Sequence, residues 1–274
     1  MLFTQSPFSP LNRPDFSTHL KYISLLAKLA RGVSISSTSN ALLTPTELPA
    51  IRDKVRLIEL TKKSIDDECG IVQMDEEYST AAVLWLPIKS YYLAYHLLCV
   101  IDCLMTGKTS QLRAKHVDCV KHFTGLLSSG SLQFSQPLFN QVFDKSILNF
   151  RSTSGANLRG NTEDDVVYKL IMKKVANEKI ASWKLSHGIT EVRTIRNRQR
   201  VESFKQSLTV SIFDFFYQMR LRLNYSNFDF IDNMPASQTK AYFTLYFLTA
   251  SHFFNCFSNF KNKLITDISV GISP

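Results

Sequence analysis

One apolar stripe at helical spacing constrains the fold of this chain more than any other feature. Its members recur every three or four residues: Val201, Phe204, Leu208, Ile212, Phe215, Met219 and Leu223. Side chains at that spacing share one face of an α-helix, so the stripe predicts a long buried helix over residues 191–226. Comparable patterns recur along the 274 residues, which include 9 Gly and 9 Pro, and no strand pattern is evident. The sequence therefore predicts an all-α fold.

Helix start and stop signals divide the rest of the chain. Pro87 suits the first turn of a helix, and Gly107 is typical of a helix end. An acidic run at residues 163–165 suits another helix start. With the hydrophobic periodicity, these signals predict helices over residues 18–30, 44–70, 87–107, 110–127, 161–185 and 236–264.

Composition indicates a folded, basic chain. Hydrophobic residues make up 45% and charged residues 20%, which is enough for a large core, and 20 Phe predict that aromatic rings fill it. The formal net charge is +9. A surplus of that size favours a polyanionic partner, such as RNA, DNA or an acidic protein surface.

The sequence favours a cytoplasmic protein. Its five Cys are an odd number, and residues 1–7 have neither the basic nor the apolar region of a secretory signal. Residues 241–260 carry no charge and have the length of a membrane span. Seven polar residues make a buried helix the better interpretation and predict no membrane contact: Thr244, Thr249, Ser251, His252, Asn255, Ser258 and Asn259.

Two clusters have the residue types of a metal site. One combines thiols and imidazoles that suit zinc: Cys99, Cys103, His116, Cys119 and His122. It lies in apolar surroundings without a Cys-x-x-Cys knuckle, so core packing is favoured. The other is Glu163, Asp164 and Asp165, which resembles a Mg²⁺ ligand set. Negative charge at a helix start is the alternative that we favour, and the sequence predicts neither a metal nor a cofactor.

A basic segment precedes the arginine pair Arg220 and Arg222. Its cations are Arg193, Arg196, Arg198, Arg200 and Lys205. A run of charge is most often a solvated helix face, but the bias to arginine favours contact with phosphates. The sequence therefore predicts a nucleic-acid-binding surface here.

Three motifs together resemble the HEPN superfamily of small helical domains. They are Tyr91–Leu104, Lys115–Phe123 and Met219–Phe228, in the order typical of the family. The resemblance covers about residues 81–127 and 200–264. It implies that residues 1–80 form an N-terminal arm and helical extension. It also implies that residues 81–274 form a HEPN-like helical bundle with an insertion at about 128–190.

The resemblance also implies a function. HEPN domains commonly dimerise, and many are metal-independent ribonucleases of toxin–antitoxin, CRISPR-associated and anti-phage systems, while others are non-catalytic binding modules. Their cutting motif is an Arg followed, after four to six residues, by a His. The implied chemistry is attack of a 2′-hydroxyl on the adjacent phosphate, with the His assisting proton transfer and the Arg stabilising the charge.

Matching the Asn–Tyr step, Asn224 and Tyr225, to the family pattern makes Arg222 the family's arginine, with Arg220 as the alternative. These four are the candidate catalytic residues. The histidine is missing, because the corresponding positions hold Asn227, Phe228 and Asp229. A histidine distant in sequence could replace it, and the candidates are His116, His122 and His187.

Three functions remain open from the sequence. The first is an RNA-binding or nucleotide-binding protein of a prokaryotic defence or toxin–antitoxin system without the standard catalytic histidine. The second is an active ribonuclease with a displaced histidine, and the third is a structural subunit that docks on an acidic protein. The expected partners are RNA or another polyanion, and a homodimer or a complex with a nucleotidyltransferase or ATPase.

Overall fold

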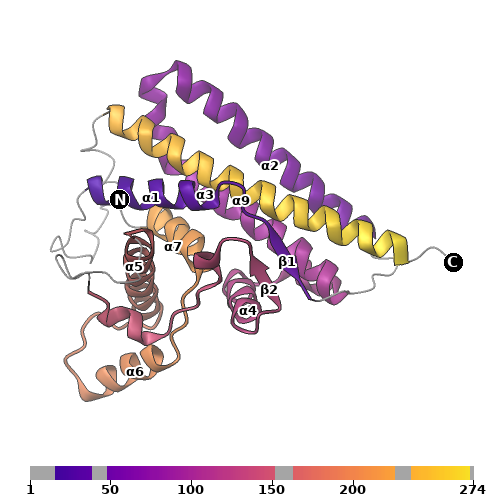
Figure 1. Ribbon diagram of the computed structural model, residues 1–274. Helices are drawn as coiled ribbons and strands as arrows, with labels where there is room; N and C mark the ends of the chain where they lie inside the picture. Colours follow the sequence, from indigo (N-terminus) through magenta and orange to yellow (C-terminus); the bar gives the residue numbers. More distant parts are fainter. Residues whose placement is uncertain (1–15, 39–47, 152–162, 226–235, 272–274) are drawn as a thin grey trace.

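The computed structural model describes residues 16–38, 48–151, 163–225 and 236–271 (Figure 1). This part of the chain is mostly helical with little strand, which confirms the all-α prediction. The α-helices are α1 Phe16–Ala30, α2 Leu48–Met74, α3 Glu76–Thr106, α4 His116–Ser128, α5 Glu163–Ser186, α6 Ile195–Gln206, α7 Ile212–Tyr225 and α9 Ala236–Gly271. Short 3₁₀ helices are η3 Thr109–Arg113, η4 Pro137–Asn140 and η5 Lys145–Asn149. Residues 1–15, which belong to the predicted N-terminal arm, lie outside the described residues.

Helices α3 and α9 form the central pair of the fold. Helix α2 packs against α3 along one edge, and α1 and α7 pack on the other side of the pair (Figure 1). Helices α4 and α5 flank α7, and α6 packs against α5. This arrangement brings α3, α4 and α7 together, which are the helices that carry the three sequence motifs.

Helix α3 begins earlier than predicted. Asp75 caps it, since its side chain accepts a hydrogen bond from the backbone N–H of Tyr78 at 3.0 Å. Pro87 therefore lies inside the helix, and the prediction that it opens a helix is wrong. Packing against α2 and α9 compensates for the backbone hydrogen bond that proline cannot make. Gly107 ends the helix with φ 67°, as predicted.

Apolar character alone does not identify the helices that could cross a membrane. Ala81–Thr106 in α3 is long and apolar enough to do so by length and composition. However, 61% of its most apolar window is buried inside the protein, as in the core helix of a soluble protein. Residues 241–260 belong to α9, where Tyr246, Phe253 and Phe257 are buried, in agreement with the predicted buried helix.

The predicted helix over residues 191–226 is two helices, so that prediction is wrong. Residues 207–211 separate α6 from α7. Val210 exchanges two backbone hydrogen bonds with Phe143, at 2.8 and 2.9 Å. The backbone groups of Val210 therefore pair with Phe143 and do not make the hydrogen bonds of a continuous helix. The hydroxyls of Ser211 and Thr124 also lie 2.7 Å apart. Leu208 and Ile212 are four residues apart and both are buried, so the helical spacing of apolar residues continues across the break.

Two smaller differences follow from tertiary contacts. The predicted helix over residues 110–127 is divided into η3 and α4, and the hydroxyl of Tyr95 donates to the carbonyl of Ala114 between them. The structure also has a two-stranded antiparallel sheet, in which β1 Ile35–Ser37 pairs with β2 Leu132–Phe134. Strands of three residues are too short to give a recognisable alternating pattern.

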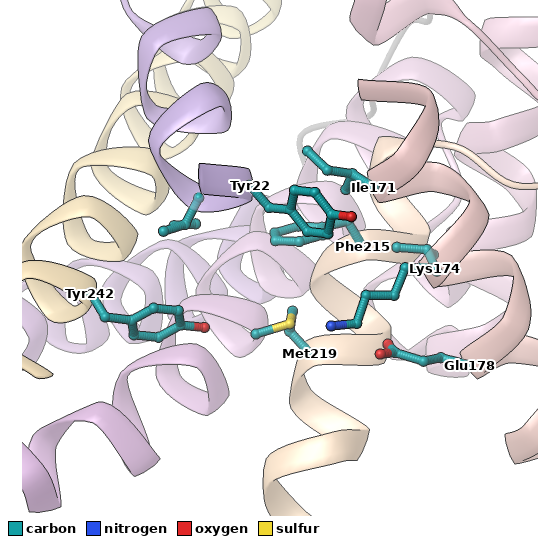
Figure 2. Close-up of a pocket in the computed structure, with 9 residues that line it drawn as sticks. Tyr22, Ile171, Lys174, Glu178, Phe215, Met219 and Tyr242 are labelled. Carbon is teal, nitrogen blue, oxygen red and sulfur yellow. The ribbon is translucent and has the colours of Figure 1, made fainter. Parts of the chain in front are cut away.

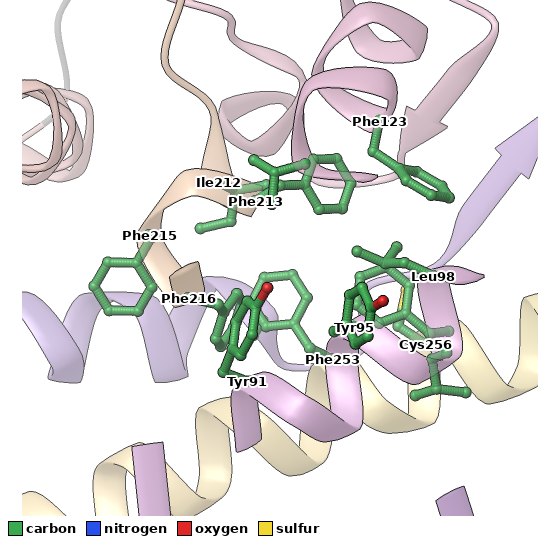
Figure 3. Close-up of a cluster of buried hydrophobic side chains, with 14 of the residues drawn as sticks. Tyr91, Tyr95, Leu98, Phe123, Ile212, Phe213, Phe215, Phe216, Phe253 and Cys256 are labelled. Atoms are coloured by element: carbon green, nitrogen blue, oxygen red, sulfur yellow. The ribbon is translucent and has the colours of Figure 1, made fainter. Parts of the chain in front are cut away.

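Aromatic rings fill the core, as the composition predicts. The ring of Phe253 from α9 lies 5.0 Å from that of Phe139 and 5.1 Å from that of Phe216, measured between centroids. Figure 3 shows this cluster continuing through Phe213 and Phe123 to Tyr91 and Tyr95 of α3. The same aromatic layer therefore supports the side chains of the candidate site.

Candidate anion-binding site

Arg220 lies in the last turns of α7 with its side chain half-buried. Its guanidinium carbon is 5.3 Å from the ring centroid of Tyr91 and 5.0 Å from that of Tyr92, both on α3. One terminal nitrogen, Nη2, donates to the hydroxyl of Tyr92 at 3.0 Å. The cation is thus held by two aromatic faces and a neutral hydroxyl.

No carboxylate pairs with Arg220 in the part of the chain that the structure describes. Its buried Nε also has no hydrogen-bond partner there. A guanidinium has five N–H donors in a rigid plane, and carboxylate or phosphate is their usual partner. Arg220 therefore offers a partly dehydrated cation with unused donors.

His116, the first residue of α4, completes the cluster. Its Nδ1 lies 2.7 Å from the hydroxyl of Tyr91, so Tyr91 contacts both the imidazole and the guanidinium. The ring of Tyr95 lies 4.1 Å from that of His116, and its hydroxyl anchors Ala114 just before α4. We call Tyr91, Tyr92, His96, His116 and Arg220 the Arg220 cluster.

The electrostatic environment of the Arg220 cluster is positive. Burial, Arg220 and Lys54 together lower the pKa of His116. Burial, with Lys54 and His116 nearby, lowers the pKa of His96 to about 4. Burial raises the pKa of Tyr91, although Arg220 opposes that effect. Both imidazoles are therefore neutral near pH 7, and no acidic side chain is among the groups that shift their pKa values.

The structure brings only some of the predicted site residues together. Arg220 lies in the cluster, and His116 is the one candidate histidine beside it. Residues Arg222, Asn224 and Tyr225 belong to α7 by their backbone, but their side chains lie outside the described set. Their predicted catalytic role therefore stays a prediction.

The other two candidate histidines lie elsewhere. His122 Nε2 is 3.2 Å from a carboxylate oxygen of the buried Asp102. His187 stacks on Trp183, with ring centroids 4.3 Å apart, and its Nδ1 is 2.8 Å from the carbonyl oxygen of Trp183. Neither contacts Arg220.

The predicted basic surface lies on α6 and the segment before it. Arg193, Arg196 and Arg198 are exposed, while Arg200 and Lys205 are half-buried. Arg193 pairs with Glu191 and Lys205 pairs with Glu202, each at 3.3 Å, and Arg198 Nε donates to a backbone carbonyl. These are solvated contacts on a helix that packs against α5, separate from the Arg220 cluster.

Neither metal alternative gains support. Within the described ranges, no three His, Cys, Asp or Glu side chains are grouped so that they could hold a metal ion. Cys99, Cys103 and Cys119 are buried in the core, with Cys119 hydrogen-bonded to Cys99. The acidic trio lies in the first turn of α5, as predicted, and its members pair with Lys21, Lys28 and Lys169.

A small cavity lies next to α7 but is not a ligand site. It is enclosed by α1, α5, α7 and α9, and Figure 2 shows Tyr22, Tyr242 and Met219 around it. Its volume of about 20 Å³ is sufficient for one water molecule. The candidate site is therefore the half-buried Arg220 cluster.

Sequence reasoning missed the roles of Tyr91, Tyr92 and His96. A signal was present, because Tyr92 and His96 are four residues apart and lie on one helix face in a strongly basic chain. The contact of Tyr91 and Tyr92 with Arg220 depends on the packing of α3 against α7, which spacing along the chain does not encode.

No family model matches this chain, and neither a curated protein nor a solved structure shows significant similarity to it. The fold and site define an all-α protein with an arginine–tyrosine–histidine cluster.

Proposed function

We propose that this chain binds RNA, or a nucleotide-bearing partner, by contacting phosphate with Arg220. The observation that carries the proposal is a half-buried guanidinium without a carboxylate partner among the described residues. Phosphate accepts two parallel N–H donors from arginine, and the tyrosine rings hold the guanidinium in a fixed orientation. The half-buried Tyr92 ring and the neutral, half-buried imidazoles of His96 and His116 can also stack on or hydrogen-bond to bases.

The α6 arginines supply a second, weaker contribution. Arg193, Arg196 and Arg198 are exposed and would contact phosphates through solvent-screened charge. Such contacts position a nucleic acid without reading its sequence. The net charge of +9 favours the same class of partner.

The biological setting rests on the motif resemblance. We place the chain among HEPN-like proteins of a prokaryotic defence or toxin–antitoxin system, acting in the cytoplasm. A homodimer, or a complex with a nucleotidyltransferase or an ATPase, belongs to the same proposal.

RNA affinity tests the proposal directly. Fluorescence anisotropy with a labelled single-stranded RNA of mixed sequence should give affinity that falls steeply as salt rises. Arg220→Gln should weaken binding by about tenfold or more, because it removes a partly dehydrated charge–phosphate contact. Arg31→Ala removes an exposed arginine of the α1 end and is the matched control, with an expected change of less than about threefold. Binding that is absent, or equal in all three proteins, would contradict the proposal.

A second candidate function is metal-independent RNA cleavage, favoured by the proximity of His116 to Arg220. The lowered pKa of His116 leaves it neutral and able to accept the 2′-hydroxyl proton near pH 7. The 2′-oxygen would bond to phosphorus as the bond to the 5′-oxygen breaks, with Arg220 stabilising the charge on the phosphate and a proton from solvent completing the 5′-hydroxyl. The products would be a 2′,3′-cyclic phosphate and a 5′-hydroxyl end.

Cleavage of end-labelled RNA in the presence of EDTA distinguishes the two functions. An active ribonuclease should lose at least about 100-fold of its rate in His116→Gln, while RNA affinity changes little. A substrate with 2′-deoxyribose at the cleaved position should resist cutting. If wild-type protein leaves RNA intact, the binding function alone remains.

A further inference from the structure

Helix α2 carries apolar side chains on two opposite faces. The inner face packs against α3 and α9 through Ile51, Ile58, Ile65 and Val72, all at most 5% exposed. The outer face carries Leu57, Leu60, Ile71 and Met74, which are 42%, 58%, 42% and 84% exposed. Figure 1 shows α2 as the outermost helix along its edge of the molecule. We call these four residues the outer stripe.

The outer stripe is symmetric about the middle of α2. Leu57 and Met74 are equally far from the midpoint between Ile65 and Asp66, and so are Leu60 and Ile71. Leu60 and Ile71 are eleven residues, or about three turns, apart and share one helix face, with Ser64 and Asp67 between the two apolar pairs. A face with this symmetry complements an antiparallel copy of itself, because each large side chain then meets another large side chain.

The charges of α2 have the matching asymmetry. Residues 48–63 contain five basic and two acidic side chains, whereas residues 64–74 contain three acidic and no basic ones. Some of these are paired inside the chain, as in Lys62 with Asp66 and Lys89 with Glu68. Arg56, Lys63 and Asp67 form no ion pair with another described residue. An antiparallel copy would set the basic half of one helix against the acidic half of the other.

An open groove runs beside the outer stripe. Leu60, Ser64 and Ile71 of α2 line it with Tyr78 and Lys89 of α3, and its volume is about 320 Å³. Trp85 is 56% exposed and lies on the same face of α3 as Tyr78 and Lys89, given its spacing of seven and four residues from them. The apolar surface therefore widens from α2 onto α3.

We infer that a second copy of this chain packs its α2 antiparallel against the outer stripe, about a twofold axis near Ile65 and Asp66. Leu57 then contacts Met74 of the second copy, Leu60 contacts Ile71, and Lys63 lies beside Asp67. Such an interface is isologous, so each contact occurs twice. Helix α2 lies outside the residues that carry the HEPN resemblance and outside the Arg220 cluster, so the interface does not depend on the proposed phosphate binding by Arg220.

Sedimentation equilibrium on the full-length protein tests the interface. Wild type should be a dimer at micromolar concentration, and Leu60→Glu or Ile71→Glu should each raise the dimer Kd by about 100-fold or more, because two buried charges enter one interface. Leu185→Glu changes a leucine of α5 that is 56% exposed and should leave the dimer intact. Both stripe positions are exposed, and circular dichroism verifies that the variants fold. A monomeric wild type, or a dimer that survives both substitutions, overturns the inference.

Cysteine cross-linking tests the antiparallel register, in a Cys69→Ser background that removes the one half-exposed native thiol of the described residues. Two copies of Ser64→Cys would be about 5 Å apart along the helix axis and should form a disulfide under mild oxidation. Two copies of Leu57→Cys would be about 25 Å apart and should not. A mixture of Leu57→Cys and Met74→Cys proteins should cross-link. A disulfide between two copies of Leu57→Cys would indicate parallel helices and would overturn the arrangement.

A charge exchange provides the last test. Lys63→Glu should weaken the dimer about tenfold, since it places like charges beside each other twice. Adding Asp67→Lys should restore most of the affinity, because the exchanged pair keeps opposite signs. Failure of the double variant to recover affinity would contradict the proposed register.

Discussion

Arg220 combines partial burial with the absence of an acidic neighbour among the described residues. Partial dehydration of an arginine costs several kcal/mol, whereas each aromatic face returns only about 0.5–2 kcal/mol. Two tyrosine faces and one hydroxyl therefore do not compensate the charge fully. A bound phosphate would supply the remaining stabilisation, so Arg220 is the residue at which we expect an anion to bind.

His96 should make the stability of the protein dependent on pH. Its pKa is about 4 in the folded protein against 6.5 as the ordinary value. The unfolded chain thus binds a proton at higher pH than the folded chain. The stabilising contribution is complete above pH 6.5 and is lost as pH falls towards 4.

We expect this loss to be on the order of 2 kcal/mol after allowance for solvent screening. His96→Asn should flatten the corresponding part of the profile, measured as the free energy of urea unfolding at pH 7 and pH 4.5. His187→Gln, at an exposed histidine, is the control and should follow the wild-type profile. Equal slopes in wild type and His96→Asn would contradict the prediction.

At the scale of elements, the start of α7 decides where the site forms. Asp214 is 1% exposed, accepts a hydrogen bond from the backbone N–H of Ser211 at 3.0 Å and pairs with Lys179 at 2.6 Å. Lys179 also donates to the carbonyl of Thr209 at 2.7 Å. These contacts tie the start of α7, the helix that carries Arg220, to α5.

Asp214→Asn should lower the free energy of unfolding by about 3 kcal/mol, because Lys179 loses its buried counter-ion. Lys205→Ala breaks the solvated pair with Glu202 and should cost less than about 1 kcal/mol. Urea unfolding monitored by circular dichroism measures both. A loss below 1 kcal/mol in Asp214→Asn would show that the buried pair does not stabilise α7.

At the scale of the whole molecule, aromatic packing joins helices that are far apart in sequence. Phe253 of α9 contacts the rings of Phe134, Phe139, Phe216 and Phe257. The same core includes buried residues of α1, α2, α3, α4, α5 and α7. We therefore expect one cooperative unfolding transition for the described part of the chain.

Phe253→Ala should reduce the free energy of unfolding by about 3–5 kcal/mol, because it leaves a cavity among rings that cannot close around it. Leu248→Ala, on the same helix but 39% exposed, should cost less than about 1 kcal/mol. Thermal and urea unfolding would measure both. Similar losses in the two variants would argue against a continuous aromatic core.

Local sequence signals determined most of the helices. The acidic first turn of α5, the end of α3 at Gly107 and the burial of α9 all follow from periodicity, helix-end charge and glycine chemistry, which act within a few residues. The prediction that Pro87 opens a helix was wrong because packing along α3 overrode the local preference of proline for a helix start. The break between α6 and α7 was hidden, since its apolar residues keep helical spacing while Val210 pairs with Phe143.

The sequence by itself determined an all-α chain with a phenylalanine-rich core, a basic surface and arginines near the end of one helix. Only the tertiary structure decided that Arg220 meets Tyr91, Tyr92 and His116, residues more than one hundred positions earlier in the chain. The physical reason is one of range. Helices depend on contacts three or four residues apart, whereas the site depends on how α3, α4 and α7 pack, and that packing is set by the shape of the whole core.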